Sequence, residues 1–375
     1  MKERVERMEK VRYGIIGIGV MGSRHANRLF AGEDPNGVLA AVCDIDPARL
    51  AWAKEAFGIP TFLNYREMYA SGLIDAVIIA TPHYDHPKLA IEAFRADLHV
   101  LCEKPAGVYT KQVREMNEAA AQTDKKFTMM FLMRNTPVFS KLKDLIDGGE
   151  LGVLKRIQWT VTTWYRPQAY HDSSTWRSRW ATEGGGVLIN QAPHNLDLWQ
   201  WLFGMPETIT AHMSFGRYFD IEVEDDVTAF MQYKNGVTGT FITSTGEAPG
   251  TNCLEIVGDM GKIVVTNSSK ITFYRNRTSE RIHNAAKTSK SVPEYWVFDV
   301  PTPGVDETHM SVIKNLSNAI INNAPLAIHG EDGMRSLQLS NAMHLSAWTG
   351  KTISLPVDEE LYYSLLQERI SNAKK

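Results

Sequence analysis

The feature that most constrains the fold of this chain is a glycine-rich turn, Gly17–Gly22, with the sequence GIGVMG. It stands between an apolar run, Tyr13–Ile18, and a helical pattern, Met21–Phe30. The spacing GxGxxG at a strand-to-helix turn is typical of βαβ units that bind a dinucleotide. Glycines let the backbone approach a pyrophosphate, and the helix N-terminus stabilises its negative charge. A tight turn without a ligand is the alternative.

An acidic residue supports the dinucleotide interpretation. A second apolar run, Val38–Cys43, ends at Asp44, 22 positions after Gly22. A carboxylate there can accept hydrogen bonds from both ribose hydroxyls and would repel a 2′-phosphate, which favours NAD over NADP. Arg49 is near enough in sequence to leave NADP open. We therefore predict a cofactor site for NAD, with NADP possible, that includes Gly17, Gly19, Val20, Met21, Gly22 and Asp44.

The first third of the chain alternates between two patterns. Further apolar runs occur at Ala76–Ala80, His99–Leu101 and Phe127–Phe131, and helical patterns at Pro47–Phe57, His86–Arg95 and Lys111–Gln122 separate the runs. This alternation predicts an α/β domain over residues 1–132, a doubly wound parallel sheet of the Rossmann type.

Loops at the carboxyl ends of such strands line the ligand crevice. Thr81 and Pro82 follow the run Ala76–Ala80 and are therefore predicted to contact the cofactor. His86, at the start of the next helical pattern, either contacts the cofactor or makes a structural hydrogen bond.

The pattern changes after Gly148-Gly149, and residues 133–375 are predicted to form an α+β domain with a large, mostly antiparallel open sheet. One long helix is predicted near Val187–Phe203, and the polar stretch Asn267–Lys290 is predicted to be a loop. Strands are expected from Leu154 onward and at Thr208–Met213, Val227–Tyr233, Val237–Ser244, Cys253–Val257 and Lys262–Val265. The closing helices, Thr308–Asn323, Asp332–Ala347 and Asp358–Asn372, are expected to pack back on the first domain.

Composition narrows the possible partners. The chain has 375 residues, 43% hydrophobic and 22% charged, which suits a two-domain globular protein. Its net charge of −3 gives no basic field, so neither nucleic acid nor a membrane is an expected partner. The charged N-terminus lacks the apolar segment of a secretion signal. Cys43, Cys102 and Cys253 are far apart, which favours small packed residues in a reducing, cytoplasmic location over disulfides or zinc.

Two further motifs carry a family resemblance. Glu103-Lys104-Pro105 follows the run His99–Leu101, and a second cluster extends from Gly184 to Asp197. With Gly17–Gly22, they resemble the Gfo/Idh/MocA family of sugar and cyclitol dehydrogenases, and the resemblance covers almost the whole chain. It implies that Lys104 lies beside the nicotinamide and the substrate hydroxyl, and that the Lys104–Pro105 peptide bond is cis. Glu103 and Lys104 are accordingly placed in the cofactor site.

The second cluster contains polar residues at helical spacing. Asn190, His194 and Asp197 are spaced i, i+4 and i+7, which predicts that they share one helix face. The family pattern has an aspartate four residues before the histidine, whereas this chain has Asn190. An amide can hydrogen-bond a hydroxyl but cannot hold a negative charge. Lys104 and His194 are therefore predicted to be catalytic, and Asn190 and Asp197 to position the substrate.

Aromatic residues and arginines precede the three glycines. Aromatic rings can stack on a sugar face and arginines can bind its hydroxyls, so these residues are predicted to position the substrate. The arginines also suit a phosphate or carboxylate, which leaves sugar phosphates, nucleotide sugars and uronates open. A half-buried sheet rim is the alternative. The residues are Trp164, Tyr165, Arg166, Tyr170, Trp176 and Arg177.

These features predict an NAD(P)-dependent oxidoreductase that acts on a hydroxyl-bearing ring carbon of a sugar, glycoside or cyclitol. His194 would transfer the hydroxyl proton and Lys104 would stabilise the oxyanion, without a metal. Two alternatives stay open: a non-catalytic NAD-binding regulator, and an NAD-dependent glycoside hydrolase that oxidises its substrate transiently. The expected partners are a carbohydrate and further copies of the chain, as a dimer or tetramer, because the family's open sheet commonly packs against another subunit.

Overall fold

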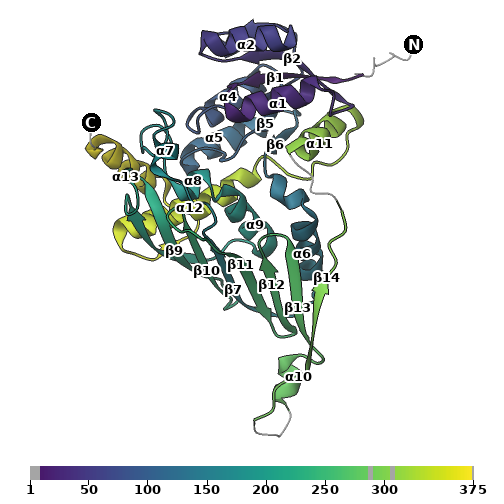
Figure 1. Ribbon diagram of the computed structural model, residues 1–375, viewed down its shortest axis with the longest axis vertical. Helices are drawn as coiled ribbons and strands as arrows, with labels where there is room; N and C mark the ends of the chain where they lie inside the picture. Colours follow the sequence, from purple (N-terminus) through teal and green to yellow (C-terminus); the bar gives the residue numbers. More distant parts are fainter. Residues whose placement is uncertain (1–8, 286–289, 305–308, 374–375) are drawn as a thin grey trace. The chain divides into compact units, whose positions relative to one another are not determined.

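The computed structural model describes residues 9–285, 290–304 and 309–373 (Figure 1). The chain divides into two compact units. The first comprises Met1–Leu132 and Glu307–Leu337, and the second comprises Met133–Asp306 and Gln338–Lys375. The chain therefore passes from the first unit to the second, returns to the first, and ends in the second. Within the described ranges, no helix has the length and hydropathy needed to cross a bilayer.

Over its described residues, the first unit contains a six-stranded sheet with the order β3-β2-β1-β4-β5-β6. Every neighbouring pair is parallel, which confirms the predicted doubly wound sheet. The strands are β1 (Val11–Ile16), β2 (Gly37–Cys43), β3 (Thr61–Phe62), β4 (Ala76–Ile79), β5 (His99–Cys102) and β6 (Phe127–Met129). The strand order reverses between β1 and β4, and ligands bind outside the carboxyl ends of the strands at such a point.

Helices connect these strands and pack on the sheet. Helix α11 belongs to this unit although it lies late in the sequence, and it contacts α1, β1 and β2. Its predicted first residue, Thr308, lies outside the described residues. The helices are α1 (Val20–Phe30), α2 (Pro47–Phe57), α3 (Tyr65–Ala70), α4 (Asp85–Arg95), α5 (Thr110–Ala120) and α11 (His309–Asn322).

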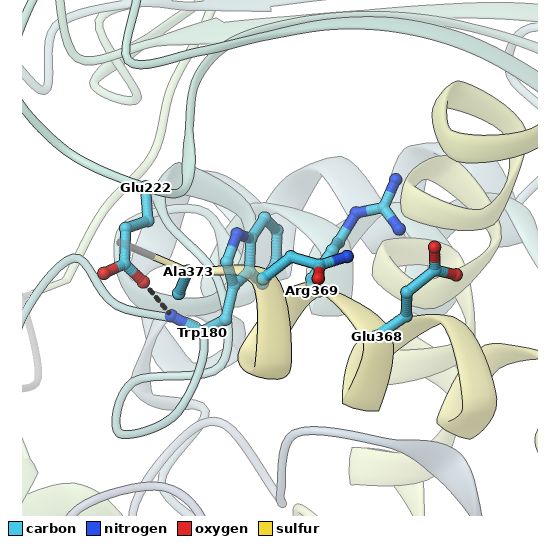
Figure 2. A pocket seen from close by; sticks show the side chains of 6 residues that line it. Trp180, Glu222, Glu368, Arg369 and Ala373 are labelled. Carbon is cyan, nitrogen blue, oxygen red and sulfur yellow. Dashed lines mark hydrogen bonds between the residues drawn. The ribbon is translucent and has the colours of Figure 1, made fainter. Parts of the chain in front are cut away.

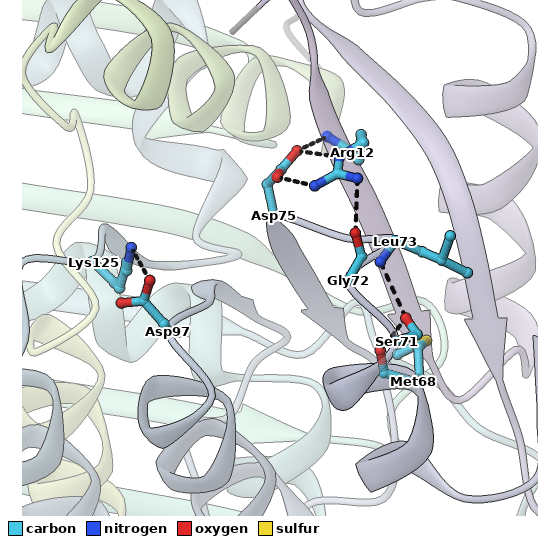
Figure 3. A network of polar contacts seen from close by, with 8 residues as sticks. All are labelled: Arg12, Met68, Ser71, Gly72, Leu73, Asp75, Asp97 and Lys125. Atoms are coloured by element: carbon cyan, nitrogen blue, oxygen red, sulfur yellow. Dashed lines mark hydrogen bonds and ion pairs between the residues drawn. The ribbon is translucent and has the colours of Figure 1, made fainter. Parts of the chain in front are cut away.

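Ion pairs hold the amino ends of these strands, opposite the ligand edge (Figure 3). Arg12, at the start of β1, donates from Nε and Nη2 to Asp75 at 2.9 and 2.6 Å, and from Nη1 to the Gly72 carbonyl at 2.8 Å. Lys125, before β6, pairs with Asp97, before β5, at 2.9 Å. Partly exposed pairs of this kind contribute up to about 1 kcal/mol each, so they secure the sheet without taking part in the ligand edge.

In the second unit, the described residues form a nine-stranded sheet with the order β14-β13-β12-β11-β7-β10-β9-β8-β15. Its neighbouring pairs are antiparallel except β7 with β10, which confirms the mostly antiparallel prediction. The strands are β7 (Leu154–Val161), β8 (Thr208–Phe215), β9 (Glu224–Gln232), β10 (Thr238–Ser244), β11 (Asn252–Gly258), β12 (Gly261–Thr266), β13 (Lys270–Asn276), β14 (Tyr295–Val300) and β15 (Ile353–Ser354).

One face of this sheet forms the core of the unit. Alternate residues of β9, Val227, Ala229 and Met231, are buried there with Trp199 and other large side chains. The Trp199 indole donates a hydrogen bond to the Tyr233 hydroxyl at 2.9 Å, which satisfies its polar atom inside the core. The helices of the unit are α6 (Pro137–Asp147), α7 (Gln168–His171), α8 (Val187–Asn190), α9 (Pro193–Phe203), α10 (Glu280–Asn284), α12 (Asp332–Thr349, which begins in the first unit) and α13 (Glu359–Asn372).

The prediction of a loop over Asn267–Lys290 is wrong for much of that stretch, because β13 and α10 lie within it. Residues 286–289 of the stretch lie outside the described residues. On β13, Ile271 and Phe273 are buried, while Thr272 donates to Asp299 of β14 at 2.8 Å. A short strand needs few inward apolar residues, so its low overall hydrophobicity concealed the two-residue period.

Candidate active site

The predicted dinucleotide turn joins β1 to α1, and two of its glycines, Gly17 and Gly22, are sterically required. Gly17 has a φ of +81°, and a Cβ there would lie 2.7 Å from the Ala80 carbonyl oxygen. A Cβ on Gly22 would lie 1.8 Å from the Gly17 carbonyl oxygen. Helix α1 begins after Gly19 with no capping side chain, and Val20 is 77% exposed. Uncapped amides at an accessible helix N-terminus fit a pyrophosphate.

Asp44 stands at the carboxyl end of β2, where it is held by backbone amides. Its Oδ2 accepts from the Ile18 amide at 2.8 Å, and its Oδ1 accepts from the Asp46 amide at 2.9 Å. Each oxygen keeps a second lone pair for a ribose hydroxyl. The next residue, Ile45, is 90% exposed and suits contact with a flat base, a feature that sequence analysis missed. Arg49 donates to the Ile18 carbonyl at 2.9 Å.

The His86 side chain contacts two loops, which follow the carboxyl ends of β4 and β5. Its Nδ1 lies 2.7 Å from the Pro105 carbonyl oxygen, and its Nε2 lies 2.8 Å from the Thr81 carbonyl oxygen. Burial lowers the pKa of the ring, against the effect of both carbonyls. The ring is 1% exposed, so the structural alternative is favoured for His86. By this contact it positions the loops that carry Thr81, Pro82 and Lys104.

Glu103 makes a buried ion pair that sequence analysis missed. Its Oε1 lies 2.7 Å from Nε2 of His25 on α1, and both side chains are almost fully buried. Burial alone would raise the pKa of Glu103, but the hydrogen bond and charge of His25 outweigh it and lower the pKa to about 2. The pair links the loop before Lys104 to the dinucleotide helix. The Lys104–Pro105 peptide bond is cis, which confirms that prediction.

In the second unit, the predicted long helix over Val187–Phe203 is wrong, because the chain forms two helices there. Helix α8 ends at Asn190, and α9 begins at Pro193. Proline has no amide hydrogen, so it ends a preceding helix and suits the first turn of the next. Asn190 therefore lies on a different helix from His194 and Asp197, and the prediction of one shared face is also wrong.

Asp197 is buried in a bidentate ion pair. Arg134 donates from Nε to Oδ2 at 2.8 Å and from Nη2 to Oδ1 at 2.5 Å. Gln200 also donates to Oδ1, at 3.0 Å. Asp197 is 1% exposed, and this environment favours a structural role over the predicted substrate contact. Arg134 had no signal in the sequence.

Asn190 contacts a carboxylate that the sequence analysis did not single out. Its side-chain amide donates to Oε1 of Glu183. Oε2 of Glu183 accepts from the Ser178 amide at 2.5 Å, and Nη1 of Arg177 lies 4.0 Å from Oε1. Burial raises the pKa of Glu183 to about 7, although these hydrogen bonds and Arg177 oppose the rise. An acidic residue directly before three glycines was the available signal.

The predicted aromatic and arginine residues form one group around Tyr170. The guanidinium carbons of Arg166 and Arg177 lie 5.0 and 4.5 Å from the centre of its ring. The Tyr170 hydroxyl accepts from Arg177 at 2.7 Å and from Gln191 at 3.2 Å. The remaining members stack on the same arginines or adjoin them: Trp164, Tyr165 and Trp176. The group presents planar cations and rings, as recognition of a sugar or an anion requires.

The start of α8 is fixed by a different glutamate. Glu224, on β9, accepts from the amides of Gly186 and Leu188 at 2.8 and 3.0 Å. His344 of α12 lies 3.0 Å from the same carboxylate, and both side chains are fully buried. Glu224 thus anchors the three-glycine turn from the sheet side.

A separate cavity of about 400 Å³ lies beside α13 (Figure 2). Its lining includes Trp180, Glu222, Glu368 and Arg369, and Glu222 accepts from the Trp180 amide at 3.2 Å. None of the predicted site residues lines this cavity, so it is not part of the candidate site.

Comparison with known proteins agrees with both units. Residues 11–131 match the oxidoreductase family model for an NAD-binding Rossmann fold, and residues 139–264 match the GFO/IDH/MocA C-terminal domain. Myo-inositol 2-dehydrogenase of Thermotoga maritima is 23% identical over 92% of this chain and 98% of its own length. Levoglucosan dehydrogenase of Pseudarthrobacter phenanthrenivorans is 23% identical over 93% of this chain and 99% of its own length.

Among solved structures, the WlbA dehydrogenase from Bordetella pertussis, in complex with NADH and UDP-GlcNAcA, superposes with a TM-score of 0.79. It is 27% identical and matches 93% of this chain and 100% of its own. The NAD-binding model matches residues of the first unit, and the C-terminal model matches residues of the second unit. This chain is therefore an NAD-dependent oxidoreductase that belongs to the Gfo/Idh/MocA family.

Proposed function

We propose that this enzyme is a dehydrogenase for a hydroxyl-bearing ring carbon of a sugar, glycoside or cyclitol. The observation that carries the proposal is the group of arginines and aromatic rings around Tyr170, joined through Arg177 and Glu183 to Asn190. Rings and forked donors suit a carbohydrate. The relatives with inositol and levoglucosan in their names support the same substrate class.

The chemistry requires a proton acceptor and a stabiliser of negative charge. A nicotinamide cofactor would be held by the Gly17–Gly22 turn and Asp44, and it would supply the hydride acceptor needed to oxidise the C–O single bond to a carbonyl. We assign the hydroxyl proton to His194, because an imidazole can serve as base and, in reduction, as acid. Lys104 stabilises the developing negative charge on the substrate oxygen. One proton thus passes to His194, and the hydride would pass to the cofactor.

The residues around Tyr170 set the range of substrates to test. Arg166 and Arg177 suit a carboxylate or phosphate as well as hydroxyls, so uronates and nucleotide sugars belong beside neutral sugars. The regulator and glycoside hydrolase alternatives are not favoured, because relatives that match over most of the chain carry dehydrogenase names.

The test is NADH formation, followed by absorbance, with inositols, hexoses, glycosides, uronates and nucleotide sugars. We expect turnover with at least one of these classes. Lys104→Ala and His194→Ala should each lower kcat by about 10²-fold or more while NAD still binds. Their combined loss should be smaller than the product of the separate losses, as for residues that act in one step. Absence of turnover across the panel would refute the proposal, and strictly multiplicative losses would refute the shared step.

A further inference from the structure

The chain has an amide at position 190, but a carboxylate lies against that amide. The amide nitrogen of Asn190 donates to Oε1 of Glu183, a residue seven positions earlier. Because the nitrogen is directed to Glu183, the amide oxygen points to the other side of the amide group, and its two lone pairs allow it to accept a hydrogen bond from a ligand. The orientation of Asn190 therefore depends on Glu183.

The position of Glu183 is itself tightly determined. Its side chain is 3% exposed, and its other oxygen accepts from the Ser178 amide at 2.5 Å. Arg177 lies 4.0 Å away and connects it to Tyr170. A buried carboxyl held by a backbone amide cannot rotate freely, so it can fix the groups that bind to it. One carboxylate thus joins Asn190 to the arginine and aromatic group.

We propose that Glu183 is a positioning residue for the substrate: it holds the Asn190 amide so that the amide oxygen accepts a hydrogen bond from a substrate hydroxyl, and it holds Arg177 against Tyr170. This inference rests on the proposed function, because it assigns Asn190 and Arg177 to the substrate.

The proposed role of Glu183 requires its ionised form. A carboxylate accepts from the amide nitrogen of Asn190, whereas a protonated carboxyl donates and would attract the amide oxygen instead. Burial places the pKa of Glu183 at about 7, with Arg177 lowering it and Glu224 raising it. As the pH falls below this value, Glu183 binds a proton and the required orientation of Asn190 is lost.

Two other titratable groups lie near Glu183, because His171 and Glu224 line one small cavity with it. His171 on α7 lies 2.6 Å from the Ser178 hydroxyl, and burial lowers the pKa of this histidine. His344 on α12 contacts Glu224. The acidic decline of kcat/KM near pH 7 must therefore be assigned by substitution rather than by its position alone.

The test measures kcat/KM against pH in Glu183→Gln with the substrate that the wild type turns over best. We expect a loss of about 10²-fold from misplaced substrate, and loss of the acidic decline that belongs to Glu183. The double variant E183Q/N190D restores a carboxylate–amide pair in the reverse order and should recover at least about tenfold of that loss. Glu222→Gln is the matched control, since Glu222 also accepts a backbone amide, that of Trp180 (Figure 2).

Two results would overturn the inference: unchanged kcat/KM and pH profile in E183Q, or equal losses in E183Q and E222Q. Should E183Q fail to fold, Asn190→Ala tests the same contact from the other side and must also remove the acidic decline. The infrared band of a protonated carboxyl provides a readout that needs no turnover. This band should appear in the wild type below about pH 7, be absent in E183Q, and shift in N190A. A wild type that turns over no sugar but shows this band would refute the proposed function alone, whereas a missing band refutes the inference.

Discussion

Alanine at Gly22 and at Gly19 should separate the structural and the ligand-binding roles of the dinucleotide turn. In Gly22→Ala, the new Cβ would lie 1.8 Å from the Gly17 carbonyl oxygen, where no contact under about 3.0 Å is tolerated, so the backbone must move by about 1 Å. Gly17 cannot yield easily, because its amide donates to the Cys43 carbonyl at 2.8 Å. We therefore expect a cost near the upper end of the overpacking range, about 3 kcal/mol.

Gly19→Ala meets no such obstacle. Gly19 has a φ of −69°, and a Cβ there has Arg49 Nη1 as its nearest neighbour, at 3.8 Å, an ordinary contact. The free energy of unfolding without cofactor should therefore change by less than about 0.5 kcal/mol. The methyl group would nevertheless stand where the pyrophosphate approaches the backbone, so NAD affinity should fall by at least about tenfold.

Thermal unfolding with and without NAD distinguishes the two variants. A cost of 3 kcal/mol lowers the Tm of a unit of this size by roughly 6–12 °C, so G22A should melt early even without NAD. G19A should melt like the wild type without NAD and gain less than the wild type when NAD is added. Equal melting of G22A and wild type would refute the steric argument. A normal NAD response in G19A would refute the placement of the pyrophosphate.

Two further variants test neighbouring parts of the same unit. Asp44→Ser removes the charge at the end of β2, so the preference for NAD over NADP should fall by roughly tenfold, measured by fluorescence titration of both cofactors; an unchanged ratio would contradict the role of Asp44. Glu103 has a folded-state pKa lowered to about 2 from 4.5, so its ionisation stabilises the fold above about pH 4.5, and this contribution is lost as the pH falls toward 2. Urea unfolding against pH should show that loss in the wild type and not in Glu103→Gln, and identical slopes would refute the ion pair with His25 as its cause.

The first unit could be predicted from local sequence patterns because its strands are buried on both faces. A strand of that kind appears as a continuous apolar run, as in Ala76–Ile79, and each run is followed by a turn and a helical pattern. The glycine turn and Asp44 lie within one βαβ unit, so short-range spacing was enough to place them. The fold of this unit therefore followed from neighbours in the sequence.

The second unit was harder because its strands are half-exposed and its helices are short. On β14, the residues from Tyr295 to Phe298 are all more than 40% exposed, so the strand has no inward pattern to detect. Pro193 indicates the break between α8 and α9, whereas the spacing of Asn190, His194 and Asp197 indicates one continuous helix. Proline is compatible with a first helical turn and not with a helix interior, which is why the second helix begins at Pro193.

The carboxylates of Asp197 and Glu183 show why site residues need the folded structure. Asp197 had the favourable spacing, yet Arg134, 63 residues away in the sequence, occupies both of its oxygens. Glu183 had no favourable spacing, yet the turn through the three glycines brings it against Asn190. Whether a carboxylate can act at a site depends on its long-range partners, and spacing within one helix contains no information about them.

The contact with Glu183 also changes the interpretation of Asn190. In the sequence, this amide stands where the family pattern has a carboxylate, which is compatible with the alternative of a non-catalytic regulator. Glu183 accepts a hydrogen bond from that amide, so a carboxylate is still present beside position 190. Asn190 therefore does not favour a protein without catalysis.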